Sequence, residues 1–187
     1  MLHREALVAK RIDDELYQVL QIVVKTVNYV KAHPLKDRLF EALCHEMSAE
    51  FHGLLLHSEV RWLSRGAVLN RVFALRRELA DFLSTHKSDL CIYFQDESWM
   101  LKLAYLSDIF QHLNVLNKGM QGLGLCILNV QDKVRSFMQK ISLWENKCQE
   151  GVTEMFPLYH QECMTSSEHI TPIIVSHLSH LQGYFRE

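Results

Sequence analysis

The chain has 187 residues, of which 48% are hydrophobic and 22% are charged, and its formal net charge is −2. This length and composition suffice for one or two globular domains and exclude a fibrous or disordered chain. The small net charge excludes nucleic-acid binding driven by bulk charge, so any such site must rest on a local basic patch.

Cysteine usage and the N-terminal sequence indicate the compartment. The five cysteines are odd in number and widely spaced, as expected for free thiols in a reducing environment. The first residues, "MLHREALVAK", become charged at once and contain no apolar run of signal-peptide length. No apolar run approaches the roughly 20 residues that cross a bilayer. We therefore expect an intracellular, soluble protein without a membrane partner.

The first predicted helix covers residues 13–31. Its apolar residues recur at steps of three and four, at Leu16, Val19, Leu20, Val23, Val27 and Val30. The pair His33–Pro34 should end this helix, and Pro34 suits the first turn of a second one. In that second helix, Leu35, Leu39, Leu43 and Met47 are expected to form the buried face.

Two short segments are strand candidates. The better one runs from Gly53 to Ser58, and the weaker one is "DLCIYF" from Asp89. One or two isolated strands cannot complete a sheet. With long helices on both sides, they indicate a piece of a larger α/β fold.

Three longer helices follow, over Ala67–Phe82, Trp99–Lys118 and Val130–Cys148, and a last one is expected from Pro172. The apolar positions of the first three have the spacing of packed antiparallel bundles, and short polar loops join them. The sequence therefore predicts a mainly α fold in which these three segments pack together. Phe110 and Phe137 are expected in the core.

The patterns that would indicate catalysis or a metal are missing from the sequence. The 11 histidines include no His-Glu-x-x-His helix, the cysteines form no Cys-x-x-Cys pair, and no Gly-x-Ser-x-Gly elbow occurs. Two-metal phosphoryl chemistry needs carboxylates from separate elements, whereas Asp13 and Asp14 are adjacent and Glu59 is isolated. We expect no catalytic residue, no metal site and no cofactor.

One basic patch exists, and two interpretations of it stay open. Guanidinium groups suit phosphate oxygens, so the patch could contact nucleic acid. Alternatively it is a solvated helix face with local ion pairs, such as Arg77 with Asp81 at i,i+4 spacing. We expect weak DNA binding or none. The residues of the patch are Arg61, Arg65, Arg71, Arg76 and Arg77.

The stretch "LLLHSEVRWLSRGAVLNRVFALRREL", from Leu54, resembles the signature of hAT-superfamily transposases. The branch is the one domesticated as zinc-finger BED-domain-containing and SCAN-domain-containing proteins. Segments that also resemble it are "HREALVAK" (His3), "VNYVK" (Val27), "PLKDRLFEALCHEM" (Pro34), "LAYLSDIFQHLNVLNKGMQG" (Leu103) and "MFPL" (Met155). The family-signature positions are His3, Glu59, Arg61 and Trp62.

The resemblance implies a fold and a loss of activity. It implies that residues 1–65 are a remnant of a ribonuclease-H-like core with flanking helices, and that residues 66–187 are a helical insertion-type bundle. Trp62 would lie where the core leads into the insertion. Both catalytic aspartates of the family would lie before Met1, and its catalytic glutamate beyond this chain, so Glu59 does not take that role.

The resemblance thus implies a truncated, catalytically inactive, transposase-derived chain that acts as an interaction module in a nuclear or transcription-related setting. Its protein partners are unknown, and self-association through exposed core surface is expected. Two alternatives remain: a DNA-binding remnant that uses Arg61 to Arg77, and residual nuclease or transposase activity.

Overall fold

A computed structural model of the chain describes residues 13–55, 62–121, 127–166 and 168–186. All regular elements in these ranges are helices, which confirms the mainly α class. In chain order they are α2 (Asp14–Lys31), α3 (Pro34–Glu46), α4 (Trp62–Ala74), α5 (Arg76–Thr85), the 3-10 helix η1 (Asp89–Gln95), α6 (Glu97–Gly119), α7 (Ile127–Gln149), α8 (Pro157–Cys163) and α9 (Thr171–Arg186).

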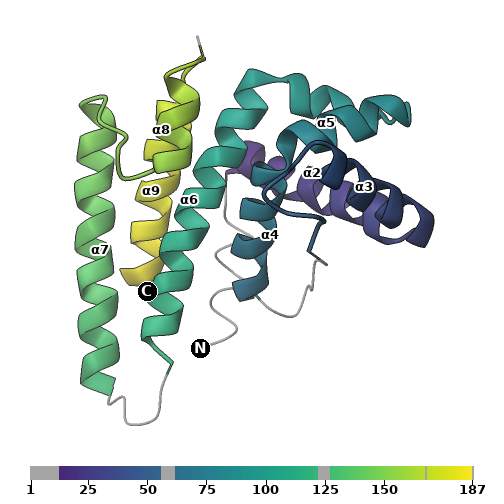
Figure 1. The fold of residues 1–187 in the computed structure, drawn as a ribbon. Helices are drawn as coiled ribbons and strands as arrows, with labels where there is room; N and C mark the ends of the chain where they lie inside the picture. Colours follow the sequence, from purple (N-terminus) through teal and green to yellow (C-terminus); the bar gives the residue numbers. More distant parts are fainter. Residues whose placement is uncertain (1–12, 56–61, 122–126, 167, 187) are drawn as a thin grey trace.

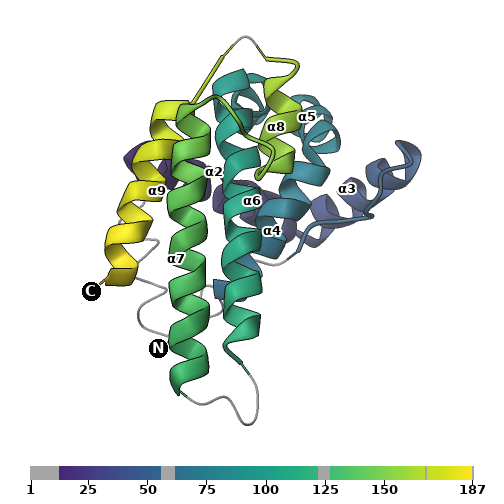
Figure 2. The same cartoon turned by 90° about the vertical axis from the view of Figure 1, so that its left-hand side faces the viewer.

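Helix α6 is the centre of the molecule. It packs along α4 and against α8, and it also contacts α2, η1 and α7 (Figure 1). Nearly every side chain from Leu103 to Phe110 is fully buried, which fits a helix covered on several sides. Helix α7 packs chiefly along α9, so these two form a layer beside α6 (Figures 1 and 2).

Helix α2 follows its predicted pattern. The Asp13 carboxylate accepts a hydrogen bond from the Glu15 amide at 3.1 Å, so this acid caps the helix entry as its position indicates. All six predicted core positions of α2 are buried. Burial of each such aliphatic side chain contributes roughly 1.5–3 kcal/mol. The 3.6-residue periodicity therefore outweighs the β-branched valines.

Neither strand candidate forms a strand among the described residues. The segment from Asp89 is the 3-10 helix η1, so the strand prediction there is wrong. Ser88 caps η1 by accepting the Leu90 amide, and Phe94 is buried against Trp99. Of the other candidate, Gly53–Leu55 is irregular, and residues 56–58 lie outside the described ranges.

The helix predicted over Ala67–Phe82 is two helices. Helix α4 ends at Ala74 and α5 begins at Arg76, with Leu75 between them and fully buried. Its apolar positions at helical spacing are nevertheless all buried: Val68, Val72, Leu75, Leu79 and Phe82. Phe110 and Phe137 are 1% and 6% exposed, as predicted. Of the three bundle segments, the first packs on the second through α4 and α6, whereas the third packs mainly on α9. The domain boundary expected after residue 65 falls within α4.

Gly66 lets α4 and α6 approach closely. It lies inside α4, so it does not break the helix there as its residue type suggests. A Cβ at this position would clash with the Asn114 amide and would lie 3.4 Å from the Phe110 Cβ. Glycine here removes the side chain from a tight helix crossing rather than supplying a turn.

The buried face of α3 is not the one predicted. Phe40 and Cys44 are fully buried, whereas Leu35, Leu39 and Met47 are 63%, 45% and 40% exposed. The Phe40 ring meets Phe82 of α5 edge-on, with centroids 5.3 Å apart. An aromatic ring buries more area than a leucine. Burial of Phe40 together with Cys44 therefore determines which face of α3 packs against the core. Of the predicted face, only Leu43 packs partly against the core, and Leu35, Leu39 and Met47 are left in solvent.

Candidate functional site

The described residues cover only part of the predicted signature. His3, Glu59 and Arg61 lie outside the described ranges, and Trp62 is the first residue of α4. Of the basic patch, Arg65, Arg71, Arg76 and Arg77 are described. Their positions decide whether α4 and α5 present a basic face.

Arg71 is used within the fold. Its guanidinium Nη1 donates a hydrogen bond to the Gly53 carbonyl at 2.8 Å, and its Cζ lies 3.9 Å from the centroid of the Phe51 ring. The contact ties α4 to the irregular segment after α3. Arg65 is half-buried and lines an open groove between α2 and α4, together with Tyr17, Leu20 and Leu69. Arg71 is thus engaged within the fold, whereas Arg65 borders the groove.

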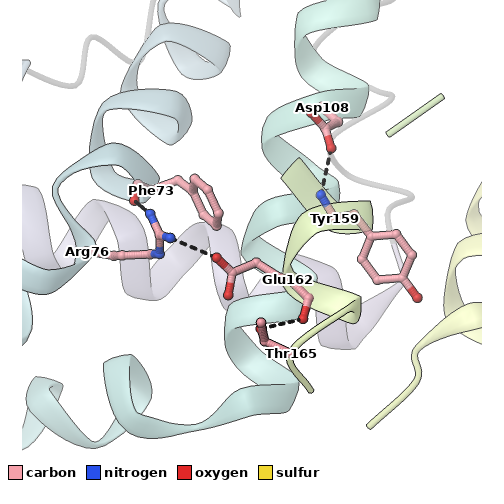
Figure 3. A network of polar contacts seen from close by, with 6 residues as sticks. All are labelled: Phe73, Arg76, Asp108, Tyr159, Glu162 and Thr165. Atoms are coloured by element: carbon pink, nitrogen blue, oxygen red, sulfur yellow. Dashed lines mark hydrogen bonds and ion pairs between the residues drawn. The ribbon is translucent and has the colours of Figure 1, made fainter. Parts of the chain in front are cut away.

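Arg76 links α5 to α8. Its Nη2 is 2.8 Å from the Glu162 carboxylate, and its Nη1 donates to the Phe73 carbonyl at 3.1 Å (Figure 3). The guanidinium also lies over the Phe73 ring at 4.3 Å. Glu162 itself starts the turn that ends α8, because its carbonyl accepts the Thr165 hydroxyl. The positive charge is thus neutralised by a residue far away in the sequence.

The predicted neutralisation of Arg77 by Asp81 is wrong. Both side chains are exposed, and the ion pairs of the described residues, Lys31–Asp37, Arg76–Glu162 and Lys102–Glu15, include neither of them. The neighbouring acid Glu78 is buried at 8% exposure. Burial raises the pKa of Cys44 to about 11, and the negative charge of Glu78 contributes to that rise. Arg77 is therefore the described arginine of this patch that faces solvent.

The Arg76–Glu162 contact should hold α8 in place. We expect Arg76→Gln to lower the free energy of unfolding by about 1–2 kcal/mol, because a half-buried charge-assisted hydrogen bond and a ring contact are lost together. A double-mutant cycle with Glu162→Gln, measured by urea unfolding, should give a coupling energy of about 1 kcal/mol. The matched control Arg77→Gln should change stability by less than about 0.5 kcal/mol. A coupling energy of zero would contradict the assignment.

A buried polar cluster joins α6, α8 and α9. The Tyr105 hydroxyl is 2.8 Å from His177 Nδ1, and both side chains are buried. Burial lowers the pKa of His177 to about 4, so the ring is neutral at pH 7 and can accept a hydrogen bond from the tyrosine hydroxyl. Burial also raises the pKa of Tyr105 well above its usual value, which keeps the phenol protonated.

Asp108 is the third buried group of this cluster. One carboxylate oxygen, Oδ2, accepts the Tyr159 backbone amide at 3.0 Å, so the side chain caps α8 from α6 (Figure 3). The other oxygen, Oδ1, has no hydrogen-bond partner among the described residues. Burial raises the pKa of Asp108 to about 7, although backbone hydrogen bonds oppose this. The cluster thus links α6 to α9 through Tyr105 and to α8 through Asp108.

Within the described ranges, histidine, cysteine and acidic residues form no group of three or more that could hold a metal ion. The thiols of Cys44 and Cys148 are buried, and burial raises the pKa of each to about 11, which disfavours the reactive thiolate. In the described part of the chain, no helix combines the length and apolarity required to span a membrane.

The feature that the sequence pattern misassigned is an apolar surface on α3. Leu35 and Leu39 lie one turn apart on the side opposite Phe40, and Met47 follows the helix end. Large apolar side chains that gather on one exposed helix face mark a contact surface more often than scattered ones do. In both views α3 lies at the edge of the molecule, away from α7 (Figures 1 and 2). Among the described residues, this face is the candidate functional site.

Comparison with known proteins gives one family. The model of the FAM200/GTF2IRD2 helical domain matches residues 1–149, which include every helix from α2 to α7. No solved structure matches the chain. Helices α8 and α9 lie beyond the matched part. Because the match covers most of the sequence, the chain belongs to the FAM200/GTF2IRD2-like helical domain family, a domesticated transposase-related family.

Proposed function

We propose that this chain is a non-catalytic protein-interaction module, descended from an hAT-superfamily transposase and acting in the nucleus. The observation that carries the proposal is the pair of exposed leucines on α3, Leu35 and Leu39, on a chain in which Arg71 and Arg76 of the basic patch make contacts within the fold. Membership in a domesticated transposase-related family supports it. In the parent enzyme, α2 and α3 would have flanked the ribonuclease-H-like core.

The apolar face favours a protein over DNA as partner for a physical reason. DNA affinity depends on cations that neutralise phosphates, and each contact releases counterions. Arg71 and Arg76 already satisfy a carbonyl and a carboxylate, so phosphate binding would have to break contacts within the fold. Leucines in solvent, by contrast, gain roughly 25 cal/mol per Å² when a partner covers them.

The test compares three versions of the chain as bait in nuclease-treated nuclear extract. The wild type and the control Leu143→Glu, which changes a 55% exposed leucine of α7, should retain the same proteins. The double variant Leu35→Glu/Leu39→Glu should lose them, because two charges cannot be buried in an apolar interface without a large cost. Equal capture by all three versions would refute the role of α3.

The alternative, a DNA-binding remnant, is tested on the same proteins. Fluorescence anisotropy with a labelled duplex should show only weak affinity at low salt, and none measurable at about 0.15 M. Sub-micromolar affinity at that salt, weakened by Arg77→Gln, would replace the protein module by a DNA-binding one. Magnesium-dependent cleavage of the same duplex would establish residual nuclease activity instead.

A further inference from the structure

The exposed face of α3 has the spacing of a helix-pairing seam. Leu35, Leu39, Ala42 and Glu46 are separated by four, three and four residues and are all exposed. This i, i+4, i+7, i+11 pattern places them along one line on the side opposite Phe40 and Cys44. The seam is apolar over its first two turns and small in the middle, which permits close approach of a second helix.

The charges of α3 differ between its two halves. The first half contains Lys36, Asp37 and Arg38, and the second half contains Glu41 and Glu46. Asp37 is paired with Lys31 of α2 at 2.7 Å, so the first half keeps a basic excess. Lys36 lies over the Tyr29 ring at 3.4 Å and Arg38 is exposed. An antiparallel helix with the same sequence would place basic residues opposite acidic ones at both ends. A parallel copy would place like charges together.

This self-complementarity is what a twofold-symmetric interface requires, since the same patch must bind itself. Helix α3 also lies at the edge of the molecule, on the side opposite the α7–α9 layer (Figure 2). We propose that two copies of this chain pair through α3 in antiparallel orientation, with Leu35 and Leu39 of each in the shared seam. This inference rests on the proposed interaction function and names the partner.

The pairing should be weak. Helix α3 has 13 residues and is therefore about 20 Å long. A seam of this length buries less than the about 800 Å² per partner of a standard interface. The expected dissociation constant is on the order of 10 µM. The full chain should therefore be studied at several concentrations up to about ten times this value.

Light scattering on the full chain tests the proposal. At about 100 µM most chains would be paired at this affinity. The measured mass should then approach twice the 21.9 kDa of one chain, and on dilution it should fall toward the mass of a single chain. Leu39→Glu should weaken pairing by at least about tenfold, and Leu143→Glu should not change it. Both leucines are exposed, so neither change should alter the helical content measured by circular dichroism.

A charge exchange tests the orientation. Glu46→Arg should weaken pairing, because the exchanged residue faces the basic half of the partner helix. The double variant Arg38→Glu/Glu46→Arg should restore it, because complementarity returns with the signs exchanged. Failure of the double variant to recover would overturn the antiparallel arrangement.

A single-chain mass at every concentration would overturn self-pairing altogether. The interaction function is judged separately, by whether a photo-crosslinker at residue 39 captures a different protein. A single-chain mass with such capture overturns this inference alone. A single-chain mass without capture overturns both proposals.

Discussion

Phe110→Ala should lower the free energy of unfolding by about 3–5 kcal/mol. Phe110 is 1% exposed on α6, where α4 crosses at Gly66, and its Cβ would lie 3.4 Å from a Cβ on that glycine. Glycine offers no side chain that could shift into the space left by the ring. The cavity should therefore persist, and the full cost of lost contacts should be measured by urea unfolding.

Val115→Ala on the same helix is the matched control. Val115 is 67% exposed, so the change should alter stability by less than about 0.5 kcal/mol. A loss below about 1 kcal/mol for Phe110→Ala would mean that the α4–α6 crossing does not form the core of this molecule. The measurement thus tests the central helix directly.

The second large expected effect concerns how stability depends on pH, to which Asp108 and His177 contribute with opposite signs. The folded-state pKa of Asp108 is raised from 3.8 to about 7 by burial, so the folded chain holds a proton that the unfolded chain has lost. Its contribution to stability is present below pH 3.8 and is lost as the pH rises to about 7. At about 1.4 kcal/mol per pKa unit, the loss is on the order of 4 kcal/mol.

His177 acts in the other direction. Its folded-state pKa is lowered from 6.5 to about 4, by burial first and by the charge of His180 second, while Asp13 opposes the shift. The unfolded chain therefore binds the extra proton, and stability is lost as the pH falls from 6.5 to about 4. This loss of stability is on the order of 3 kcal/mol. In the wild type the two contributions largely cancel.

Single variants should separate the two contributions. Relative to the wild type, Asp108→Asn should become more stable as the pH rises from about 4 to 7, by an amount on the order of 4 kcal/mol. His177→Gln, which keeps an acceptor for the Tyr105 hydroxyl, should show the opposite trend relative to the wild type. Unfolding curves at several pH values measure both differences. Profiles parallel to the wild type would contradict the burial of these two groups.

Much of the helical fold could be predicted because it depends on local periodicity. The apolar repeats of α2 and α6 match the residues that the structure buries, since a long helix with one repeated stripe has few alternative faces. Short elements were less predictable. The stretch from Asp89 has β-forming residues but pairs with no strand, and its caps and Phe94 make it the helix η1.

The candidate site was predicted poorly because its determinants lie far apart in the sequence. Nothing near Arg76 indicates Glu162, which reaches it only because α8 folds back onto α6. Likewise, the leucines of α3 have the better local pattern, and only the position of Phe82 makes Phe40 the buried residue. The signal for α8 itself was slight: Pro157 at its first turn.

Site-specific photo-crosslinking at residue 39 tests the central claim most directly. The full chain with a photoreactive amino acid in place of Leu39, or of Leu143 as the control, is irradiated in nuclease-treated nuclear extract. Both leucines are exposed to a similar degree, at 45% and 55%. We predict discrete protein adducts from residue 39, including an adduct to a second copy of the chain, and none from residue 143. Adducts of equal yield from both positions, or none from residue 39, would contradict the claim that α3 is the interaction surface.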